Sequence, residues 1–419
     1  MEESLIQLEE RYKNFLDKKI TLNMERGWPC KEQLDLSVPM LDVVNSRVDL
    51  CRENDYRGYA GTGGILPAKE LFALLFEVTT EQIYIGETMS TTIMYDLMSR
   101  AMMFGFPGYP AWKTFDKVKF ICPSPGYEKH FKICESFDIE MIPVSMNVDG
   151  PDMDAVEKLV MSDQMIKGMW CVPLYSNPTG SIYSDEIIER IAKMHTKAKD
   201  FKVFWDNAYC VHHLSDENIK IKNIIECCEK FGNADRVFEF ASTSKITFPG
   251  AGIAMCISSK NNIDWITKSR LLQLKTGDKI NQLRHVLFLK DLDGISKHMK
   301  RHQAIIKPKF DLVDSILHAE LDGWEIASWI KPKGGYFINL ELECGMAQKV
   351  WELCKAAGVS FTPAGSTFPY GIDQEDKFLR IAPTYPEKEE LKMAVELLCI
   401  AIKLVYLREK DGIKGEESY

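Results

Sequence analysis

The sequence predicts an α/β protein, with a large, mostly parallel sheet between helices and a second, smaller α+β domain. The first observation is length, because 419 residues exceed what one simple core holds. The second is that short apolar runs rich in β-branched and aromatic residues alternate with helical stretches between about residues 80 and 260. That alternation is typical of βα units. The third observation is that this alternation of strands and helices stops in the final part of the chain.

The elements can be placed in order along the chain. Leu5, Leu8, Tyr12 and Phe15 recur at helical spacing and predict an opening amphipathic helix. Residues 26–37 contain glycine and proline and predict an extended crossing. We expect strands at 82–85, 118–122, 169–174, 202–205, 236–240 and 253–257, a long helix at 295–317, and strand-like runs at 324–340 and 378–382.

These elements suggest a division into three segments. Residues 1–50 would form the helix and the crossing, packed with the small domain. Residues 51–300 would form the large domain, and residues 301–419 the small one.

Composition and charge exclude several classes of protein. A formal net charge of −9 with mixed signs leaves no basic stripe for a nucleic acid. The chain starts Met1-Glu2-Glu3-Ser4, without the basic residues of a secretory signal, and no apolar run is long enough for a membrane span. The 12 cysteines form no C-x-x-C pair, so we expect no metal site and reduced thiols in the cytoplasm.

Polar clusters follow five of the predicted strands. They occupy residues 86–90, 123–127, 177–180, 206–209 and 242–245. Ligands of open α/β sheets bind beyond the carboxyl ends of the strands, so these clusters should converge. Together they supply one lysine, one acid, an aromatic face and several hydroxyls. This combination fits pyridoxal phosphate, which is bound as a Schiff base of lysine with an acid facing its pyridine nitrogen.

The order of these motifs resembles the fold-type-I aminotransferases of the aspartate aminotransferase superfamily over nearly the full chain. The motifs are Asn-Pro-Thr-Gly from residue 177, Asp-x-Ala-Tyr from residue 206, Ser-x-Ser-Lys from residue 242, and a late arginine, Arg380. Residues 45–70, 281–285 and 362–371 look like a divergent bacterial subgroup of aspartate aminotransferases. The resemblance implies a seven-stranded, mostly parallel sheet, pyridoxal 5′-phosphate as cofactor, and a homodimer.

The resemblance also implies the residues that bind the cofactor. Lys245 matches the Schiff-base lysine, which also moves the proton at the substrate's α-carbon. Asp206 matches the acid at the pyridine nitrogen. The other matches are Asn177 and Tyr209 at the phenolic oxygen of the ring, Tyr127 stacked on the ring, Ser242, Ser244, Thr88 and Ser90 at the phosphate, and Tyr59, or Tyr56 in its place, reaching the phosphate in the neighbouring subunit.

The substrate side of the pattern is less regular. Arg380 matches the arginine that grips the α-carboxylate in a bidentate fork, and Asn177 is also expected to bind the substrate. No arginine occurs within residues 246–253, where the family usually has one for the phosphate. The resemblance favours aspartate and 2-oxoglutarate as substrates, and Lys279 is the expected second cation, with Arg284 or Arg26 as substitutes. The strand residues around Phe337 and Asn339 resemble the family's substrate-facing strand.

Two other functions share this pattern. A pyridoxal-phosphate β-lyase would use the same lysine and acid, but would release ammonia and pyruvate rather than require a 2-oxo acid acceptor. A non-catalytic ligand sensor would carry an aminotransferase-like domain behind a helix-turn-helix. Only about forty residues precede the aminotransferase-like region here, and this segment is too short and too acidic for a helix-turn-helix attachment, which disfavours the sensor.

Overall fold

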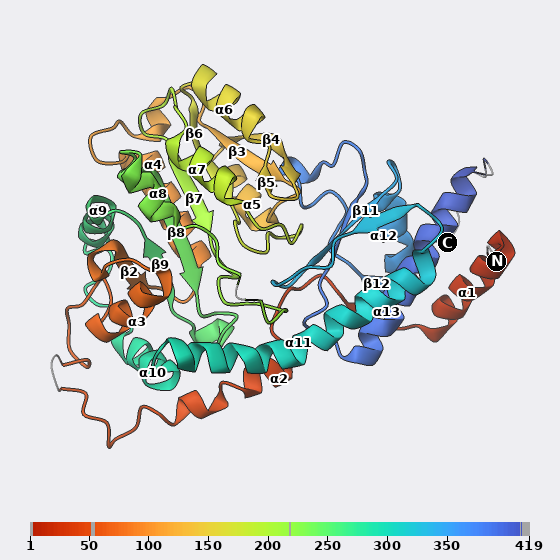
Figure 1. The fold of residues 1–419 in the computed structure, drawn as a ribbon, viewed down its shortest axis with the longest axis horizontal. Helices are drawn as coiled ribbons and strands as arrows, with labels where there is room; N and C mark the ends of the chain where they lie inside the picture. The colour runs from red at the N-terminus through yellow and green to blue at the C-terminus, as the bar shows by residue number, and fades with distance from the viewer. Residues whose placement is uncertain (1–2, 52–54, 218, 411, 413–419) are drawn as a thin grey trace.

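The large unit of the molecule is built on one eight-stranded sheet. The computed structural model describes residues 3–51, 55–217, 219–410 and 412, and Figure 1 shows a large unit and a small one side by side. The strand order in the sheet is β2-β9-β8-β7-β6-β3-β4-β5. The strands are β2 (Ile83–Gly86), β3 (Lys119–Ser124), β4 (Glu140–Asn147), β5 (Gly150–Pro151), β6 (Ile166–Cys171), β7 (Lys202–Asp206), β8 (Val237–Ser242) and β9 (Ala254–Ile257).

Six of these strands run in the same direction, and β9 and β5 run in the opposite direction. This confirms the predicted largely parallel sheet, and each of the six predicted strands has a counterpart, although β6 spans 166–171 rather than the predicted 169–174. The expected count of seven strands is exceeded by one, the two-residue β5. β4 was not predicted from the sequence, because it lies near the sheet edge and only two of its eight residues are buried. Its apolar pattern is therefore weaker than that of the central strands.

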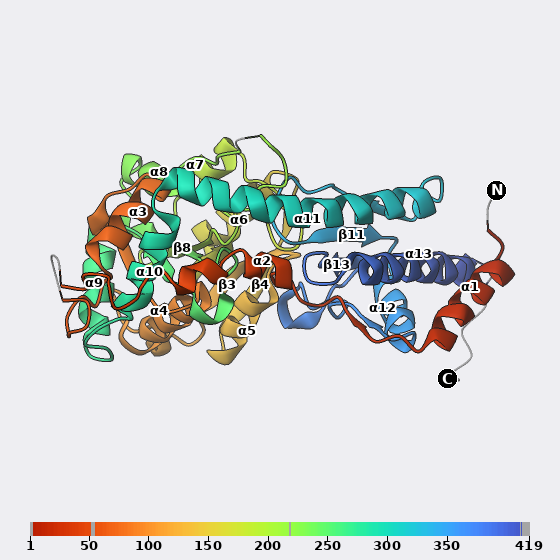
Figure 2. The same ribbon diagram turned by 90° about the horizontal axis from the view of Figure 1, so that it is seen from below.

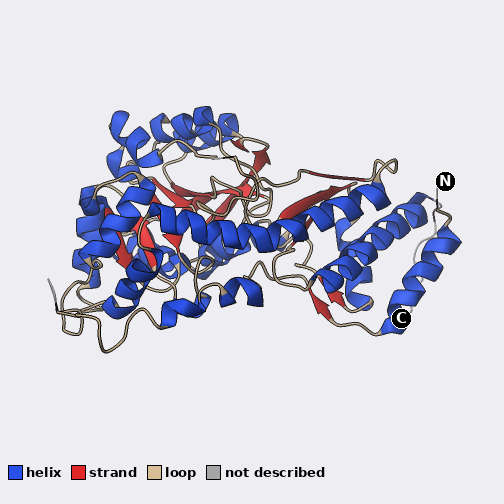
Figure 3. Cartoon of the chain, turned by 60° about the horizontal axis from the view of Figure 1, so that its bottom comes forward, coloured by secondary structure: helices blue, strands red, loops and turns tan. Residues whose placement is uncertain are grey.

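Helices cover both faces of this sheet (Figure 3). The alternation of side chains along a strand explains why both faces need cover. On β7, Phe204 packs into one apolar cluster, while Val203 and Trp205 pack into another on the opposite face. The helices of this unit are α3 (Leu66–Phe76), α4 (Ser90–Phe104), α5 (Glu128–Ser136), α6 (Met153–Ser162), α7 (Asp185–Lys193), α8 (Ile224–Lys230), α9 (Lys260–Arg270) and α10 (Lys279–Leu289).

The small unit has its own core. Its antiparallel sheet has the order β10 (Ala327–Trp329), β11 (Ile338–Leu342), β13 (Phe378–Ile381). The helices α1 (Leu5–Lys18), α12 (Ala347–Ala356) and α13 (Lys388–Lys410) pack around it, and β1 (Leu22–Asn23) pairs with β12 (Val359–Ser360). Ser4 caps α1 in a capping box with Gln7. The predicted apolar stripe is real, since Leu8, Tyr12 and Phe15 are buried in this core.

The long helix α11 (Leu292–Leu321) joins the two units and runs along both (Figure 2). Ile295 and Met299 pack into the core of the large sheet, whereas Ile306 and Phe310 pack into the small unit. The expected boundary at residue 300 therefore falls inside a continuous helix. Within residues 1–50, α1 contacts α13, α2 (Lys31–Asp35) contacts α11, and Val44 and Val48 pack against the large core. No helix in the part of the chain described here is long and apolar enough to span a bilayer.

Candidate active site

A cleft of about 430 Å³ lies where the parallel strands end. Five strands that are parallel to one another, β2, β3, β6, β7 and β8, have their carboxyl ends on this edge. The crossing segment near residue 26 and the small unit close its other side. Lining residues that carry chemistry are Arg26, Ser90, Tyr127, Glu128, Asn177, Asp206, Tyr209, Ser242, Ser244, Lys245, Thr362 and Arg380. The predicted convergence of the strand-end clusters is thus present.

Lys245 and Asp206 form the reactive centre of the cleft. Burial lowers the pKa of the Lys245 amine, while the carboxylates of Asp206 and Glu128 oppose that shift. A lowered pKa leaves more of the amine unprotonated, and hence nucleophilic, near neutral pH. Asp206 ends β7 and is 3% exposed. Its Oδ2 lies 3.0 Å from His130 Nε2, whereas its buried Oδ1 has no hydrogen-bond partner among the described residues.

That unpartnered Oδ1 is a test of the cofactor assignment. A buried acceptor without a donor is costly, and it usually signals an absent partner. A protonated pyridine nitrogen is such a donor, so the residues present fit pyridoxal phosphate. His130 is held in turn by stacking on Trp170, with ring centroids 4.2 Å apart and planes at 6°. His130 was not predicted from the sequence, although it lies only three residues after Tyr127.

Three further predicted residues lie around the same centre. The ring of Tyr209 has its centroid 5.1 Å from Lys245 Nζ, and burial raises the pKa of its hydroxyl well above the ordinary value. Asn177 is buried, and its Oδ1 accepts a bond from Arg380 Nη1 at 3.1 Å. Tyr127 packs edge-on to His130 with centroids 5.0 Å apart, and burial raises the pKa of its hydroxyl.

Hydroxyl groups gather at one end of the cleft. Ser242 Oγ donates to Ser244 Oγ (3.2 Å), and Ser244 Oγ donates to the carbonyl oxygen of Thr88 (3.0 Å). Ser90 is buried at the first residue of α4 and lines the cleft, whereas Thr88 contributes its carbonyl and does not line it. The amino end of α4 supplies amides to the same place, where an anion would be stabilised.

Arg380 occupies the opposite end of the cleft, on β13. It is 4% exposed and all of its donor groups are engaged. Nε and Nη2 donate to Thr362 Oγ1 at 3.2 and 3.0 Å. Nη1 and Nη2 donate to the two carboxylate oxygens of Glu128 at 2.6 and 3.0 Å. Glu128 is a second residue that the sequence reading missed, since it pairs with Arg380 across 252 positions.

Besides Thr88, the predicted residues Tyr59 and Lys279 do not line this cleft. Tyr59 is 81% exposed, and Lys279 is buried at the start of α10, where its Nζ donates to the carbonyl oxygens of Asp55 (3.0 Å) and Tyr59 (3.3 Å). Arg284 donates to Asn281 and does not line the cleft either. Arg26 does line it, with its guanidinium 4.2 Å from the centroid of the Trp28 ring. Tyr59 and Lys279 therefore do not contribute to the cleft of their own chain.

Comparison with known proteins agrees with this geometry. A family model described as aspartate amino-transferase matches residues 1–413. An aspartate aminotransferase of Corynebacterium glutamicum is 40% identical over 399 residues, which cover 95% of this chain and 92% of the relative. The chain belongs to the aspartate aminotransferase family.

Solved structures of such enzymes share the fold. The crystal structure of an aspartate transaminase from C. glutamicum superposes with a TM-score of 0.94 at 39% identity, covering 97% of this chain and 96% of that one. The α-aminoadipate aminotransferase LysN of Thermus thermophilus, complexed with N-(5′-phosphopyridoxyl)-L-leucine, superposes with a TM-score of 0.75 at 20% identity, covering 94% and 95%. The chain is a fold-type-I, pyridoxal-phosphate-dependent aminotransferase, which acts on an amino acid and a 2-oxo acid.

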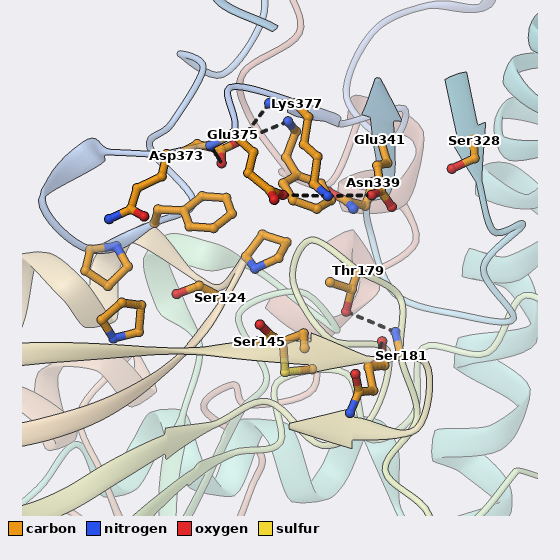
Figure 4. A pocket seen from close by; sticks show the side chains of 18 of the residues that line it. Ser124, Ser145, Thr179, Ser181, Ser328, Asn339, Glu341, Asp373, Glu375 and Lys377 are labelled. Carbon is orange, nitrogen blue, oxygen red and sulfur yellow. Dashed lines mark hydrogen bonds and ion pairs between the residues drawn. The ribbon is translucent and has the colours of Figure 1, made fainter. Parts of the chain in front are cut away.

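This aminotransferase has a second, larger groove of about 820 Å³ between the two units (Figure 4). Its lining includes Asn339, which was expected to face the substrate; Phe337, two residues earlier, lines the active-site cleft instead. The one lysine among its lining residues, Lys377, lies between Glu341 and Glu375, at 3.0 and 2.6 Å. The groove therefore offers no unpaired lysine or arginine along its described lining.

Proposed function

We propose that this aminotransferase moves the amino group of aspartate to 2-oxoglutarate, giving oxaloacetate and glutamate. The observation that carries the proposal is the meeting of Lys245, the unpartnered carboxylate oxygen of Asp206 and the guanidinium of Arg380 in one cleft. The name of the C. glutamicum relative, aspartate aminotransferase, supports a dicarboxylic donor.

In this proposal each residue has a defined task. Bound pyridoxal phosphate supplies an aldehyde for the amino group and a ring that withdraws electrons from the substrate's α-carbon. Lys245 holds the cofactor through its amine and then carries the proton between carbon atoms as general base and acid. Asp206, held by His130, keeps the ring nitrogen protonated. Asn177 and Tyr209 face the phenolic oxygen, and Tyr127 covers the ring.

The remaining tasks are binding tasks. Ser242 and Ser244, with Ser90 and the backbone amides at the start of α4, hold the phosphate at the hydroxyl end. Arg380 binds the α-carboxylate of the substrate, with Asn177 fixing one edge of the guanidinium. Neither end changes its charge during the reaction, so both act by orienting the substrate over Lys245.

A dicarboxylate needs a second cation for its side chain. Arg26 is the candidate within the chain, because it lines the cleft. Lys279 is the candidate from a neighbouring subunit, but reaching that cleft would require it to give up its bonds to the carbonyls of Asp55 and Tyr59. We favour Arg26, since this exposed residue already lines the cleft of its own chain.

The test compares Arg26→Ala with Lys279→Ala, using kcat/KM for aspartate and for alanine. Loss of a charge-assisted contact should lower the value for aspartate by about 10- to 100-fold and leave alanine nearly unchanged. If Arg26→Ala has that effect, Arg26 reads the side chain; if only Lys279→Ala has it, the partner subunit does. An enzyme that prefers alanine to aspartate before any substitution contradicts the dicarboxylate proposal.

We further propose that the enzyme is a cytoplasmic homodimer whose sites lie between subunits. The exposed Tyr59 and its neighbour Lys279 support this, because neither lines the cleft of its own chain. Mixing two inactive variants, Lys245→Ala and Tyr59→Phe, should restore part of the activity in hybrid dimers. An active monomer in sedimentation would contradict the proposal.

A further inference from the structure

Glu128 occupies the position on Arg380 that a substrate carboxylate needs. Its Oε2 accepts a hydrogen bond from Nη1 of the guanidinium at 2.6 Å, and its Oε1 accepts one from Nη2 at 3.0 Å. This parallel, two-bond pairing is the geometry by which arginine recognises a carboxylate. The other donors of Arg380 are directed to Thr362 and Asn177. A second carboxylate cannot bind the fork in the same way while Glu128 remains there.

We infer that Glu128 is an exchangeable internal ligand of Arg380, and that the α-carboxylate of either substrate binds by displacing it. The inference rests on the proposed role of Arg380 as the carboxylate-binding residue. It adds that the free enzyme already holds a carboxylate in that position, so that binding is the replacement of one carboxylate by another.

The surroundings of the pair favour movement of Glu128 rather than of Arg380. The side chain of Glu128 is 33% exposed, whereas that of Arg380 is 4% exposed. Glu128 can therefore turn into water and recover its hydration. It is also the first residue of α5, where the dipole of the helix favours a negative charge whichever way the side chain points.

Arg380 keeps its place when Glu128 leaves. Thr362 Oγ1 accepts from Nε and Nη2, and Asn177 Oδ1 accepts from Nη1. These two neutral acceptors hold the plane of the guanidinium toward the cleft, and Phe337 supports it, with its ring centroid 4.5 Å from Cζ. The exchange also conserves charge beside Lys245, because one carboxylate replaces another. The reactive amine thus experiences a similar field before and after binding.

Competition of this kind weakens every ligand of Arg380 by a common factor. The apparent dissociation constant equals the intrinsic one divided by the fraction of molecules in which the fork is free. If the fork is free in about one molecule in ten, the apparent affinity is about tenfold weaker than the site could provide. Glu128 would then prevent tight retention of the product, which is itself a carboxylate.

The experiment titrates the purified holoenzyme with succinate, an unreactive dicarboxylate, in a calorimeter. Glu128→Gln should bind succinate about tenfold more tightly than the wild type, because the amide competes poorly for the fork. The matched control is Glu25→Gln, which removes a negative charge from the lining of the same cleft; the contact of Glu25 with Arg380 is made by its backbone oxygen only. A general electrostatic effect would raise the succinate affinity of both variants alike. The inference therefore requires the gain in succinate affinity to be at least threefold larger for Glu128→Gln than for Glu25→Gln.

Two further variants separate the possible failures. Arg380→Lys should weaken succinate binding, and if it does not, the proposed role of Arg380 is wrong and the inference falls with it. If Arg380→Lys weakens binding while Glu128→Gln leaves it unchanged or weaker, Glu128 stays on Arg380 with substrate bound and only the present inference is overturned. Glu128→Ala repeats the measurement without a polar side chain, and it should tighten binding at least as much as Glu128→Gln.

Discussion

The two ends of the active-site cleft handle negative charge in different ways. At the Arg380 end, a buried cation is surrounded by oxygen acceptors and already carries a carboxylate. At the hydroxyl end, Ser242, Ser244 and the start of α4 offer neutral donors, and residues 246–253 contain no arginine. A charged guanidinium fork selects and orients a small, exchanging ligand, whereas neutral donors suit a cofactor that is also held elsewhere. Lys245 lies between the ends and should be that other attachment.

The largest effect expected is that of Lys245→Ala. It removes the covalent attachment and the group that moves the proton, so transamination should slow by at least about 10³-fold. The variant also isolates the hydroxyl end, because any cofactor that it retains is held without the lysine. Absorbance of the cofactor after gel filtration measures that retention. Turnover close to that of the wild type would remove Lys245 from its proposed role.

Much of this arrangement could be predicted from the sequence because strand ends in a parallel sheet converge. Asp206 ends β7, Ser242 ends β8, and Lys245 follows three residues later. The prediction that these three residues lie close together therefore required only the order of the strands. Arg380 was recognised by family resemblance, on the same reasoning from short motifs.

The missed features depend on how the two units pack together. The Glu128 pairing with Arg380 joins α5 to β13, and no local pattern encodes it. Arg26 was named only as a substitute cation, because its access to the cleft depends on the path of the crossing segment. Lys279 was expected to reach a substrate across a dimer interface, and that expectation stays a prediction; within its own chain it donates to the carbonyl oxygens of Asp55 and Tyr59.

The next effect concerns the support beneath the hydroxyl end. His285 contacts Thr243, which stands between Ser242 and Ser244 in the sequence. Its Nε2 lies 3.0 Å from the hydroxyls of Thr243 and Thr247, and its Nδ1 lies 2.8 Å from the carbonyl oxygen of Asn281. Burial lowers the pKa of His285 to about 4, from an ordinary value near 6.5. Below about pH 6.5 the unfolded chain binds a proton that the folded one rejects. The free energy of unfolding should therefore fall as the pH is lowered from 6.5 toward 4.

His285→Gln tests this, because glutamine does not titrate. Between pH 7.5 and pH 5 the wild type should lose about 2 kcal/mol more of its unfolding free energy than the variant does. Urea unfolding at the two pH values measures the difference. His318→Gln, which changes an exposed histidine, provides the control and should follow the wild type. Equal losses in wild type and His285→Gln would mean that His285 is not the acid-sensitive group under this loop.

The smallest effect expected is that of Ser244→Ala, and it separates the two ends most directly. Ser244 accepts from Ser242 and donates to the Thr88 carbonyl, so its hydroxyl is one of several neutral donors. Its loss should weaken cofactor binding by about 2- to 10-fold, the range for a single uncharged hydrogen bond. The Kd for substrates at saturating cofactor should stay within about twofold of the wild type, because Arg380 is untouched. Equilibrium dialysis measures the first quantity and calorimetry the second. Ser366→Ala, the same change in a serine near Thr362 that also lines the cleft, should leave cofactor affinity unchanged. If both serine variants weaken the cofactor equally, the hydroxyl end is not a distinct binding site and the contrast between the two ends fails.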